Sequence, residues 1–307
     1  MKTRMLNRPA GAALALAVLL VPTAIGATAA TAQAVGTQNW TVLVGNQTSN
    51  MAVQGERFLP GDVTIDQNDT VTWQANSAEI HTVTFFDGGA VQTSVPQFTG
   101  DPSQVSPAGG DTMGAGYFNS GLLAIGVPSY TLHFPTVGTY TYYCLVHGIM
   151  MRGVVHVQAA GMAYPYSQAD YHAQAAFEAH ALNDHGRAQM ARATAASGNH
   201  RVFTGTDDLM VMTMRFSRHK VVIHKGDTVR FLNTMSMGAP HTVTFGKVGD
   251  PFTPVGNPDN FKGGKLSSGF MPPQAKFKVT FNKVGKFHYV CLLHSEMGMK
   301  GVVVVKP

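Results

Sequence analysis

The chain has 307 residues, of which 44% are hydrophobic and only 13% are charged, with a formal net charge of +5. This composition excludes an intrinsically disordered or collagen-like protein and suffices for about two globular domains. The 22 Lys and Arg residues form no basic run and two cysteines build no disulfide framework, which argues against a nucleic-acid partner and against a disulfide scaffold.

The first 34 residues have the pattern of an export signal. Three basic residues, Lys2, Arg4 and Arg8, precede the apolar run 10–21, and small-residue triplets follow it. This run is shorter than the roughly 20 residues that cross a bilayer as a helix, and no later stretch is long enough either. We expect residues 1–34 to be removed and the mature chain to be periplasmic or extracellular, without stable membrane insertion. An uncleaved anchor is the alternative.

Short β-branched and aromatic segments, separated by Gly, Pro, Asp or Asn, predict strands in the next part of the chain. In chain order the expected strands are residues 63–65, 70–73, 82–85, 130–134, 139–143 and 154–157. Short strands at this spacing are typical of an antiparallel sandwich of about 100 to 120 residues. Further on, residues 167–196 are rich in Ala and begin with the capping-box pair Ser167 and Asp170, which predicts a linker helix that Gly186 could interrupt.

The pattern of the first part then returns, so the chain contains two copies of one domain. Residues 68–73 match 226–231, the run HTVTF at 81–85 recurs at 241–245, and residues 137–147 match 284–294. The offset falls from 160 to 147, which places about 13 extra residues in a Gly- and Pro-rich surface loop of the first copy. The predicted fold class is all-β, with sandwich domains at 35–158 and 204–307 joined by a short helical linker at 159–203.

Residues with metal-binding side chains recur in the same order in both copies. His81, Cys144 and His147 of the first copy correspond to residues 241, 291 and 294 of the second, and methionines follow each set. A thiolate, two imidazoles and a thioether suit copper that cycles between two oxidation states. For a single Cys and His, ordinary core packing would be the simpler interpretation. Repetition of the whole set in diverged copies favours a copper site in each.

These residues make each copy resemble the cupredoxins, the small blue copper proteins of the plastocyanin, amicyanin and pseudoazurin group. The resemblance covers nearly all of residues 38–158 and 204–307. It implies an eight-stranded Greek-key sandwich in each copy and up to two type 1 copper centres in the chain. It also implies that the second His of each centre lies near the surface, as the exit for electrons. The implied ligands are His81, Cys144, His147 and Met151 in the first copy, and His241, Cys291, His294 and Met299 in the second.

The resemblance also implies one axial methionine in each copy, and each copy offers an alternative methionine. Met299 lies five residues after His294 and is soon followed by Gly, as in plastocyanin-like members. Met151 precedes a basic residue and Gly, as in amicyanin-like members, but it lies four residues after the second His of its copy, where those members have three. Met150 and Met297 therefore remain the alternatives.

The resemblance implies a single-electron carrier between redox partner proteins, and we do not expect an enzyme. Two-domain copper nitrite reductases and laccase-like oxidases have a His directly beside the ligand Cys, whereas Tyr143, Leu145, Val290 and Leu292 flank the cysteines of this chain. Net charges of −6 over 35–158 and +8 over 204–307 could steer differently charged partners.

The methionines favour a different function, copper trafficking or storage. Residues 210, 212 and 214 would place three thioethers on one face of a strand, and Met235 and Met237 lie just before His241. Clustered thioethers bind Cu(I), while a methionine-lined core is the simpler interpretation.

Overall fold

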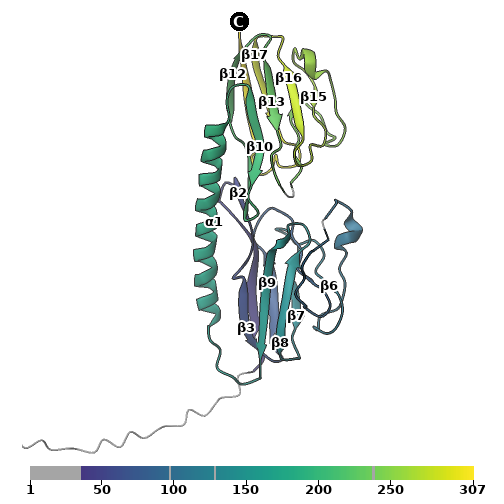
Figure 1. The fold of residues 1–307 in the computed structure, drawn as a ribbon, viewed down its shortest axis with the longest axis vertical. Helices are drawn as coiled ribbons and strands as arrows, with labels where there is room; N and C mark the ends of the chain where they lie inside the picture. Colours follow the sequence, from purple (N-terminus) through teal and green to yellow (C-terminus); the bar gives the residue numbers. More distant parts are fainter. Residues whose placement is uncertain (1–35, 97, 128, 237–238) are drawn as a thin grey trace, which may run out of the picture. The chain divides into compact units, whose positions relative to one another are not determined.

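The computed structural model describes residues 36–307 except residues 97, 128, 237 and 238 (Figure 1). The predicted export signal and its cleavage site lie outside these residues. Within the described part, nine strands precede one long helix and nine follow it. No helix of this part is long and apolar enough to cross a membrane.

The first β-rich region contains all six segments expected from the sequence. Its elements are β1 (Asn39–Gln47), β2 (Val53–Leu59), β3 (Asp62–Asp66), β4 (Thr70–Ala75), β5 (Thr84–Phe85), the short helix η1 (Pro102–Val105), β6 (Phe118–Asn119), β7 (Tyr130–His133), β8 (Gly138–Cys144) and β9 (Gly148–Gln158). β5 is shorter than the expected segment 82–85, and His81, directly before that segment, forms an isolated bridge with Leu123. The structure adds β1, β2 and β6 to the predicted strands.

The second β-rich region repeats this order after the helix. Its elements are β10 (Arg201–Asp207), β11 (Val211–Phe216), β12 (Lys220–His224), β13 (Thr228–Leu232), β14 (Thr244–Phe245), the short helix η2 (Pro258–Asn260), β15 (Leu266–Ser267), β16 (Lys276–Thr280), β17 (Gly285–Val290) and β18 (Lys300–Lys306). The connection between β5 and β6 is longer than that between β14 and β15, which confirms the predicted insertion in the first copy.

Each β-rich region is a two-layer sandwich with an aromatic core. In the first region the layer β2-β1-β4-β7 faces the layer β3-β9-β8-β5-β6, and in the second region β11-β10-β13-β16 faces β12-β18-β17-β14-β15. Between the layers of the first region Trp73 contacts Tyr142 and Phe85, with ring centroids 5.1 and 5.7 Å apart. Phe231 and Tyr289 occupy the corresponding place in the second region, 5.2 Å apart. These cores keep the ends of β8 and β17 in place.

The two sandwiches share one sheet, which the sequence did not predict. β2 pairs antiparallel with β11, with Val53 opposite Thr213 and Gln54 opposite Met212. This pairing joins one layer of each sandwich into a single eight-stranded sheet. Each strand would otherwise be the edge of a four-stranded layer, with unpaired backbone N–H and C=O groups. The pairing of β2 with β11, here called the junction, gives those groups hydrogen-bond partners within the chain.

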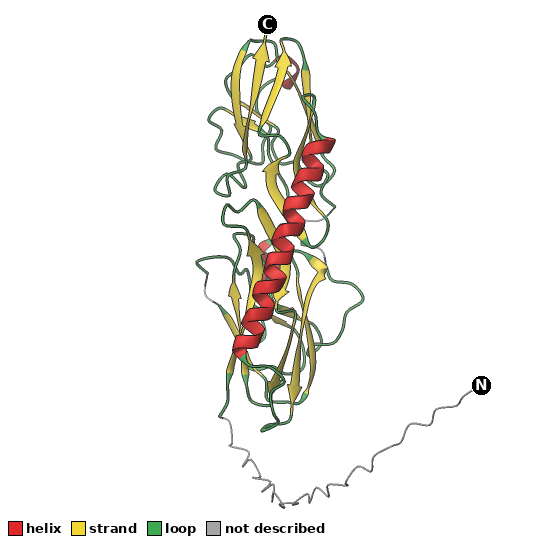
Figure 2. Cartoon of the chain, turned by 90° about the vertical axis from the view of Figure 1, so that its left-hand side faces the viewer, coloured by secondary structure: helices red, strands yellow, loops and turns green. Residues whose placement is uncertain are grey.

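The predicted linker helix is α1 (Gln168–Ala196), and it lies alongside strands of both sandwiches (Figures 1 and 2). Ser167 and Asp170 form the predicted capping box. At its ends the helix bonds to both regions, through Gln168 with the Thr41 backbone and through Thr194 with Ser217. A buried apolar cluster lies between the helix and the junction, formed by Val53, Leu59, Ala175, Leu182 and Val211.

The helix continues through Gly186 and is not interrupted there. Gly186 is buried against β2, and a Cβ atom added to it would lie 2.2 Å from Val53 Cγ1. This glycine therefore permits the close approach of helix and sheet, and this role explains its presence within the helix.

We expect the Gly186→Ala variant to unfold at a lower temperature than the parent protein. Overlap with Val53 Cγ1 should destabilise the fold by up to about 3 kcal/mol, more than the roughly 1 kcal/mol that alanine contributes as the better helix former. Thermal unfolding followed by circular dichroism measures the change. Gly198→Ala is the control, because no atom lies within 4 Å of the Cβ that it would add. A raised melting temperature for Gly186→Ala would disprove the close contact.

Candidate metal centres

The first candidate centre lies where the end of β8 meets the segment before β5. Cys144 ends β8, His147 lies in the turn to β9, and His81 bridges to Leu123 just before β5. Cys144 Sγ is 3.4 Å from His147 Nδ1 and 3.9 Å from His81 Nδ1. The backbone N–H of Thr82 donates to the same sulfur at 3.4 Å. All three side chains are buried, so the structure brings together these three predicted ligands.

The second candidate centre has the same construction after β17. Cys291 Sγ is 3.4 Å from His294 Nδ1 and 3.7 Å from His241 Nδ1, and the two Nδ1 atoms are 3.1 Å apart. The Thr242 N–H donates to this sulfur at 3.4 Å, as Thr82 does in the first centre. The repeated sequence pattern therefore corresponds to a repeated arrangement of atoms.

Both groups fit a copper ion by their donors and by their spacing. In each, the Cys sulfur lies 3.4–3.9 Å from both imidazole nitrogens, and no carboxylate belongs to either group. Donors that bind one ion at about 2.0–2.3 Å must lie within roughly 4.5 Å of one another. Imidazole suits copper, and thiolate and thioether suit Cu(I) in particular.

The packing of the methionines favours Met151 and Met299 over their alternatives. Met151 is fully buried in the core cluster that contains Cys144, and Met299 in the cluster that contains Cys291. The Cys291 N–H also donates to the Met299 carbonyl at 3.0 Å. By contrast, Met150 is 45% exposed. Met297 lies in a separate cluster of methionines.

Two glycines that the sequence reasoning missed lie directly behind the first His of each centre. Gly45 and Gly205 have φ of 75° and 77°, in the left-handed region, at irregularities of β1 and β10. A Cβ atom on Gly45 would lie 2.5 Å from His81 Nε2, and one on Gly205 would lie 2.6 Å from His241 Nε2. The two glycines are 160 positions apart, as are the two histidines, so the repeat itself was the available signal.

Each of the four histidines has a polar or sulfur partner at its outer ring nitrogen. Ser77 Oγ lies 2.8 Å from His81 Nε2, and Met235 Sδ lies 3.0 Å from His241 Nε2. The partners of the other two are carboxylates that the sequence reasoning missed: Glu56 Oε2 is 3.1 Å from His147 Nε2 and Glu79 Oε1 is 3.7 Å from His294 Nε2. No sequence motif marks these two glutamates.

The second His of each centre is more buried than the resemblance implies. His147 is 4% exposed and His294 is 7% exposed, and both face carboxylates near the junction of the sandwiches. The expectation that these rings meet partner proteins at the surface therefore does not hold for this chain. For His294 the reason is the shared sheet, which brings Glu79 of the first sandwich against the second.

Burial sets the protonation of the candidate ligands in the metal-free protein. It lowers the pKa of His147 to about 3 and of His294 to about 4, and it holds the pKa of His81 and His241 well below 6.5. It also raises the pKa of Cys144 to about 12. The imidazoles are thus neutral and ready to bind, whereas each thiol must release a proton when a metal binds.

We expect the copper-free protein to lose stability as the pH falls from about 6.5 to 4.5. Over this range the four imidazoles take up protons in the unfolded chain but stay neutral in the folded one, so protonation favours unfolding. Two buried carboxyls oppose this trend: burial raises the pKa of Glu79 to about 7 and that of Glu56 well above 4.5, and their contribution is lost as the pH rises. The four imidazoles outnumber them.

Urea unfolding of the copper-free protein at a series of pH values tests this expectation. Each unit by which folding shifts the pKa of a group should change the free energy of unfolding by about 1.4 kcal/mol over the pH range in which that group titrates. A stability that is flat or rises towards pH 4.5 would show that the imidazoles are not held neutral.

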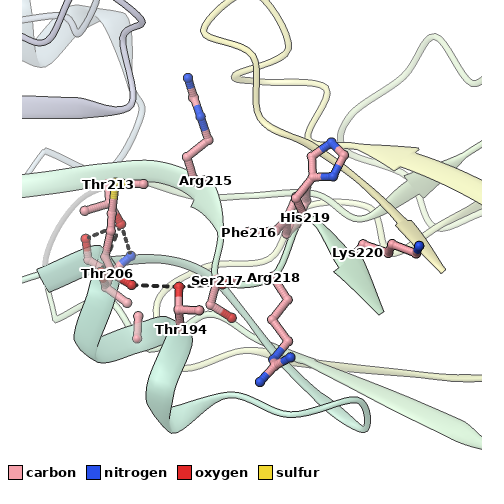
Figure 3. Close-up of a pocket in the computed structure, with 11 residues that line it drawn as sticks. Thr194, Thr206, Thr213, Arg215, Phe216, Ser217, Arg218, His219 and Lys220 are labelled. Atoms are coloured by element: carbon pink, nitrogen blue, oxygen red, sulfur yellow. Dashed lines mark hydrogen bonds between the residues drawn. The ribbon is translucent and has the colours of Figure 1, made fainter. Parts of the chain in front are cut away.

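A pocket of about 420 Å³ lies away from both centres, where α1 meets β10 and β11 (Figure 3). Hydrogen bonds tie its wall together: Thr194 Oγ1 donates to the Ser217 carbonyl at 2.8 Å, and Thr206 Oγ1 and Thr213 Oγ1 are 2.9 Å apart. None of the candidate metal ligands lines it. Among the described residues, the groups of three His, Cys, Asp or Glu side chains that could hold a metal are the two His–Cys–His groups.

Comparison with known proteins gives matches over both β-rich regions. Residues 44–158 and 204–306 match the family model for copper-binding proteins of the plastocyanin/azurin family. Similar solved structures include a reduced amicyanin variant, with 22% identity, 40% of this chain and 83% of that chain covered and a TM-score of 0.27. The Cu(I) form of another amicyanin variant has 25% identity, coverage of 37% and 90%, and a TM-score of 0.25. Reduced auracyanin from the photosynthetic bacterium Roseiflexus castenholzii has 18% identity, coverage of 35% and 95%, and a TM-score of 0.26. None of the curated proteins matches the chain.

Proposed function

Because this chain belongs to the copper-binding plastocyanin/azurin family, with one match in each β-rich region, we propose that it is an exported two-centre electron carrier that moves single electrons between redox partner proteins. Its domains would be residues 35–158 and 204–307, joined by residues 159–203. Family members are typically periplasmic or extracellular electron carriers, and the export pattern at residues 1–34 agrees with that location.

The proposed ligands are those implied by the resemblance: His81, Cys144, His147 and Met151 in the first domain, and His241, Cys291, His294 and Met299 in the second. Copper bound by these residues would supply the one-electron change. The chain's own contribution is to hold the donors still, because a site that keeps its arrangement needs little reorganisation when the charge changes.

The observation that carries this proposal is the arrangement of the donor atoms in both groups. Each buried Cys sulfur lies 3.4–3.9 Å from both imidazoles of its group and accepts a backbone N–H, and the flanking strands belong to sheets with aromatic cores. Neither cysteine has a His beside it in the sequence, so the chain lacks the link that joins a blue centre to a catalytic copper in the two-domain enzymes.

A visible absorption spectrum of the mature protein loaded with Cu(II), with copper counted per chain, tests the proposal. We expect two coppers per chain, an intense band from thiolate-to-copper charge transfer, and reversible reduction by one electron at each centre. A colourless protein, or one whose colour does not return on reoxidation, would contradict it.

A second candidate function, copper storage or trafficking, is favoured by a cluster of methionines next to the second centre. Met212, Met214, Met235 and Met297 are buried together, and Met51 of the first domain packs against them. Met210 is 36% exposed and outside the cluster, and Met237 lies outside the described residues. Thioethers bind Cu(I). Retention of more than two Cu(I) per chain, released to a competing chelator, would favour this function over electron transfer.

A further inference from the structure

The second centre is not enclosed by its own domain alone. Glu79 belongs to the first domain, two residues before the ligand His81, yet its Oε1 atom lies 3.7 Å from Nε2 of His294 in the second domain. The Glu79 side chain is 91% buried. Among the described residues its Oε1 atom has no hydrogen-bond partner. A buried carboxyl oxygen without a partner destabilises a fold unless something uses it.

The junction between the domains determines where Glu79 lies. The Glu56 N–H donates to the Met210 carbonyl at 2.8 Å, and the Met214 N–H donates to the Ala52 carbonyl at 2.9 Å. Ala78, directly before Glu79, packs against the methionine cluster of the second domain. Its own N–H donates to the Gln47 side chain at 2.9 Å. The segment that carries Glu79 is therefore held against the second centre by backbone and side-chain contacts from both domains.

The chemistry of metal-bound histidine explains what Glu79 would do there. A histidine that binds a metal through one ring nitrogen nearly always donates its other N–H to a nearby acceptor, which orients the ring and makes it a stronger ligand. His81, His147 and His241 have such neighbours within their own domains, at Ser77, Glu56 and Met235. For His294 the carboxylate within ion-pair distance comes from the other domain.

We propose that Glu79 of the first domain is a positioning residue for the second copper centre, and that the segment from Glu79 to His81 couples metal binding at the two centres. Binding at His81 fixes one end of this segment, and the other end orients His294, so each metal should raise the affinity of the other by the same factor. The inference rests on the proposed copper-binding function of both centres.

The test measures the copper affinity of the second centre by competition with a chelator, in full-length chains that carry Cys144→Ser so that only this centre binds. Glu79→Ala should weaken binding 10- to 100-fold. Glu79→Gln, which keeps an oxygen acceptor, should recover most of the affinity. The matched control is Glu296→Ala, which removes an exposed carboxylate two residues from His294 and should change the affinity little.

The coupling is tested in chains that retain both cysteines. The second centre should bind copper at least about 5-fold more tightly when the first is loaded than in the Cys144→Ser chain. Glu79→Ala should abolish this difference.

Three results would overturn the inference: parental affinity in Glu79→Ala, an equal loss in Glu296→Ala, or no rescue by Glu79→Gln. Circular dichroism confirms that each variant is folded. If Glu79→Ala is not, Glu79→Leu, which keeps most of the side-chain volume but has no acceptor, carries the test with the same expected loss of affinity. Failure of the parent chain to bind copper at either centre would instead reject the proposed function.

Discussion

A Cys144→Ser variant is expected to lose the absorbance of the first centre and to bind one copper ion per chain instead of two. The Cys144 sulfur lies within 4 Å of both imidazoles of this centre. A serine hydroxyl is a hard donor that stays protonated at neutral pH, so it replaces neither the bond to copper nor the charge-transfer band. Absorption spectroscopy and metal analysis of the same sample measure both effects.

The reciprocal variant provides the control for this result. Cys291→Ser should remove the second centre and leave the first, and the double variant should be colourless. Each variant should fold, since serine is slightly smaller than cysteine and can still accept the N–H of Thr82 or Thr242. Two coppers and undiminished absorbance in Cys144→Ser would show that this sulfur is not a ligand.

A Gly45→Ala variant is expected to be less stable than the parent protein and to retain little copper at the first centre. The added Cβ atom would lie 2.5 Å from His81 Nε2 and 2.3 Å from Ser77 Oγ, so the imidazole and the Ser77 side chain must shift from their positions. Left-handed strain and overpacking together should destabilise the fold by about 2–5 kcal/mol. Thermal unfolding and copper content measure the two effects, and Gly205→Ala should do the same at the second centre.

The control for Gly45→Ala is Gly161→Ala, which separates backbone strain from contact with the ligand. Gly161 has φ of 80° but no atom within 4 Å of the Cβ that it would gain. Its variant should show the cost of the left-handed conformation alone and keep both coppers. Equal melting temperatures and equal copper contents for the two variants would mean that Gly45 does not support His81.

The candidate ligands could be found from the sequence because the repeat preserves them against a diverged background. His81 and His241 lie within identical runs of five residues, and each Cys precedes its His by three. The capping box of α1 was equally visible, since Ser167 and Asp170 act on each other within one turn. Each of these patterns lies within a few neighbouring residues, so it can be recognised from the sequence without the tertiary structure.

The residues that contact the candidate ligands could not be found in this way, although two of them follow the repeat. Gly45 and Gly205 share the 160-residue offset of the histidines that they back, but a glycine alone does not reveal which side chain approaches it. Glu56 has no counterpart in the repeat, because Met214 occupies the equivalent position in β11. Its carboxylate meets His147 only after strands distant in the sequence have packed together.

The sequence by itself determined two cupredoxin sandwiches, their order, the helix between them and six of the proposed ligands, which the structure brings together in two groups. Only the tertiary structure decided that the sandwiches share a sheet, that His147 and His294 are buried near the junction, and that Glu79 of one sandwich faces a proposed ligand in the other. The reason is that β2 and β11 pair through backbone N–H and C=O groups. Every non-proline residue carries both groups, so this pairing has no side-chain signature.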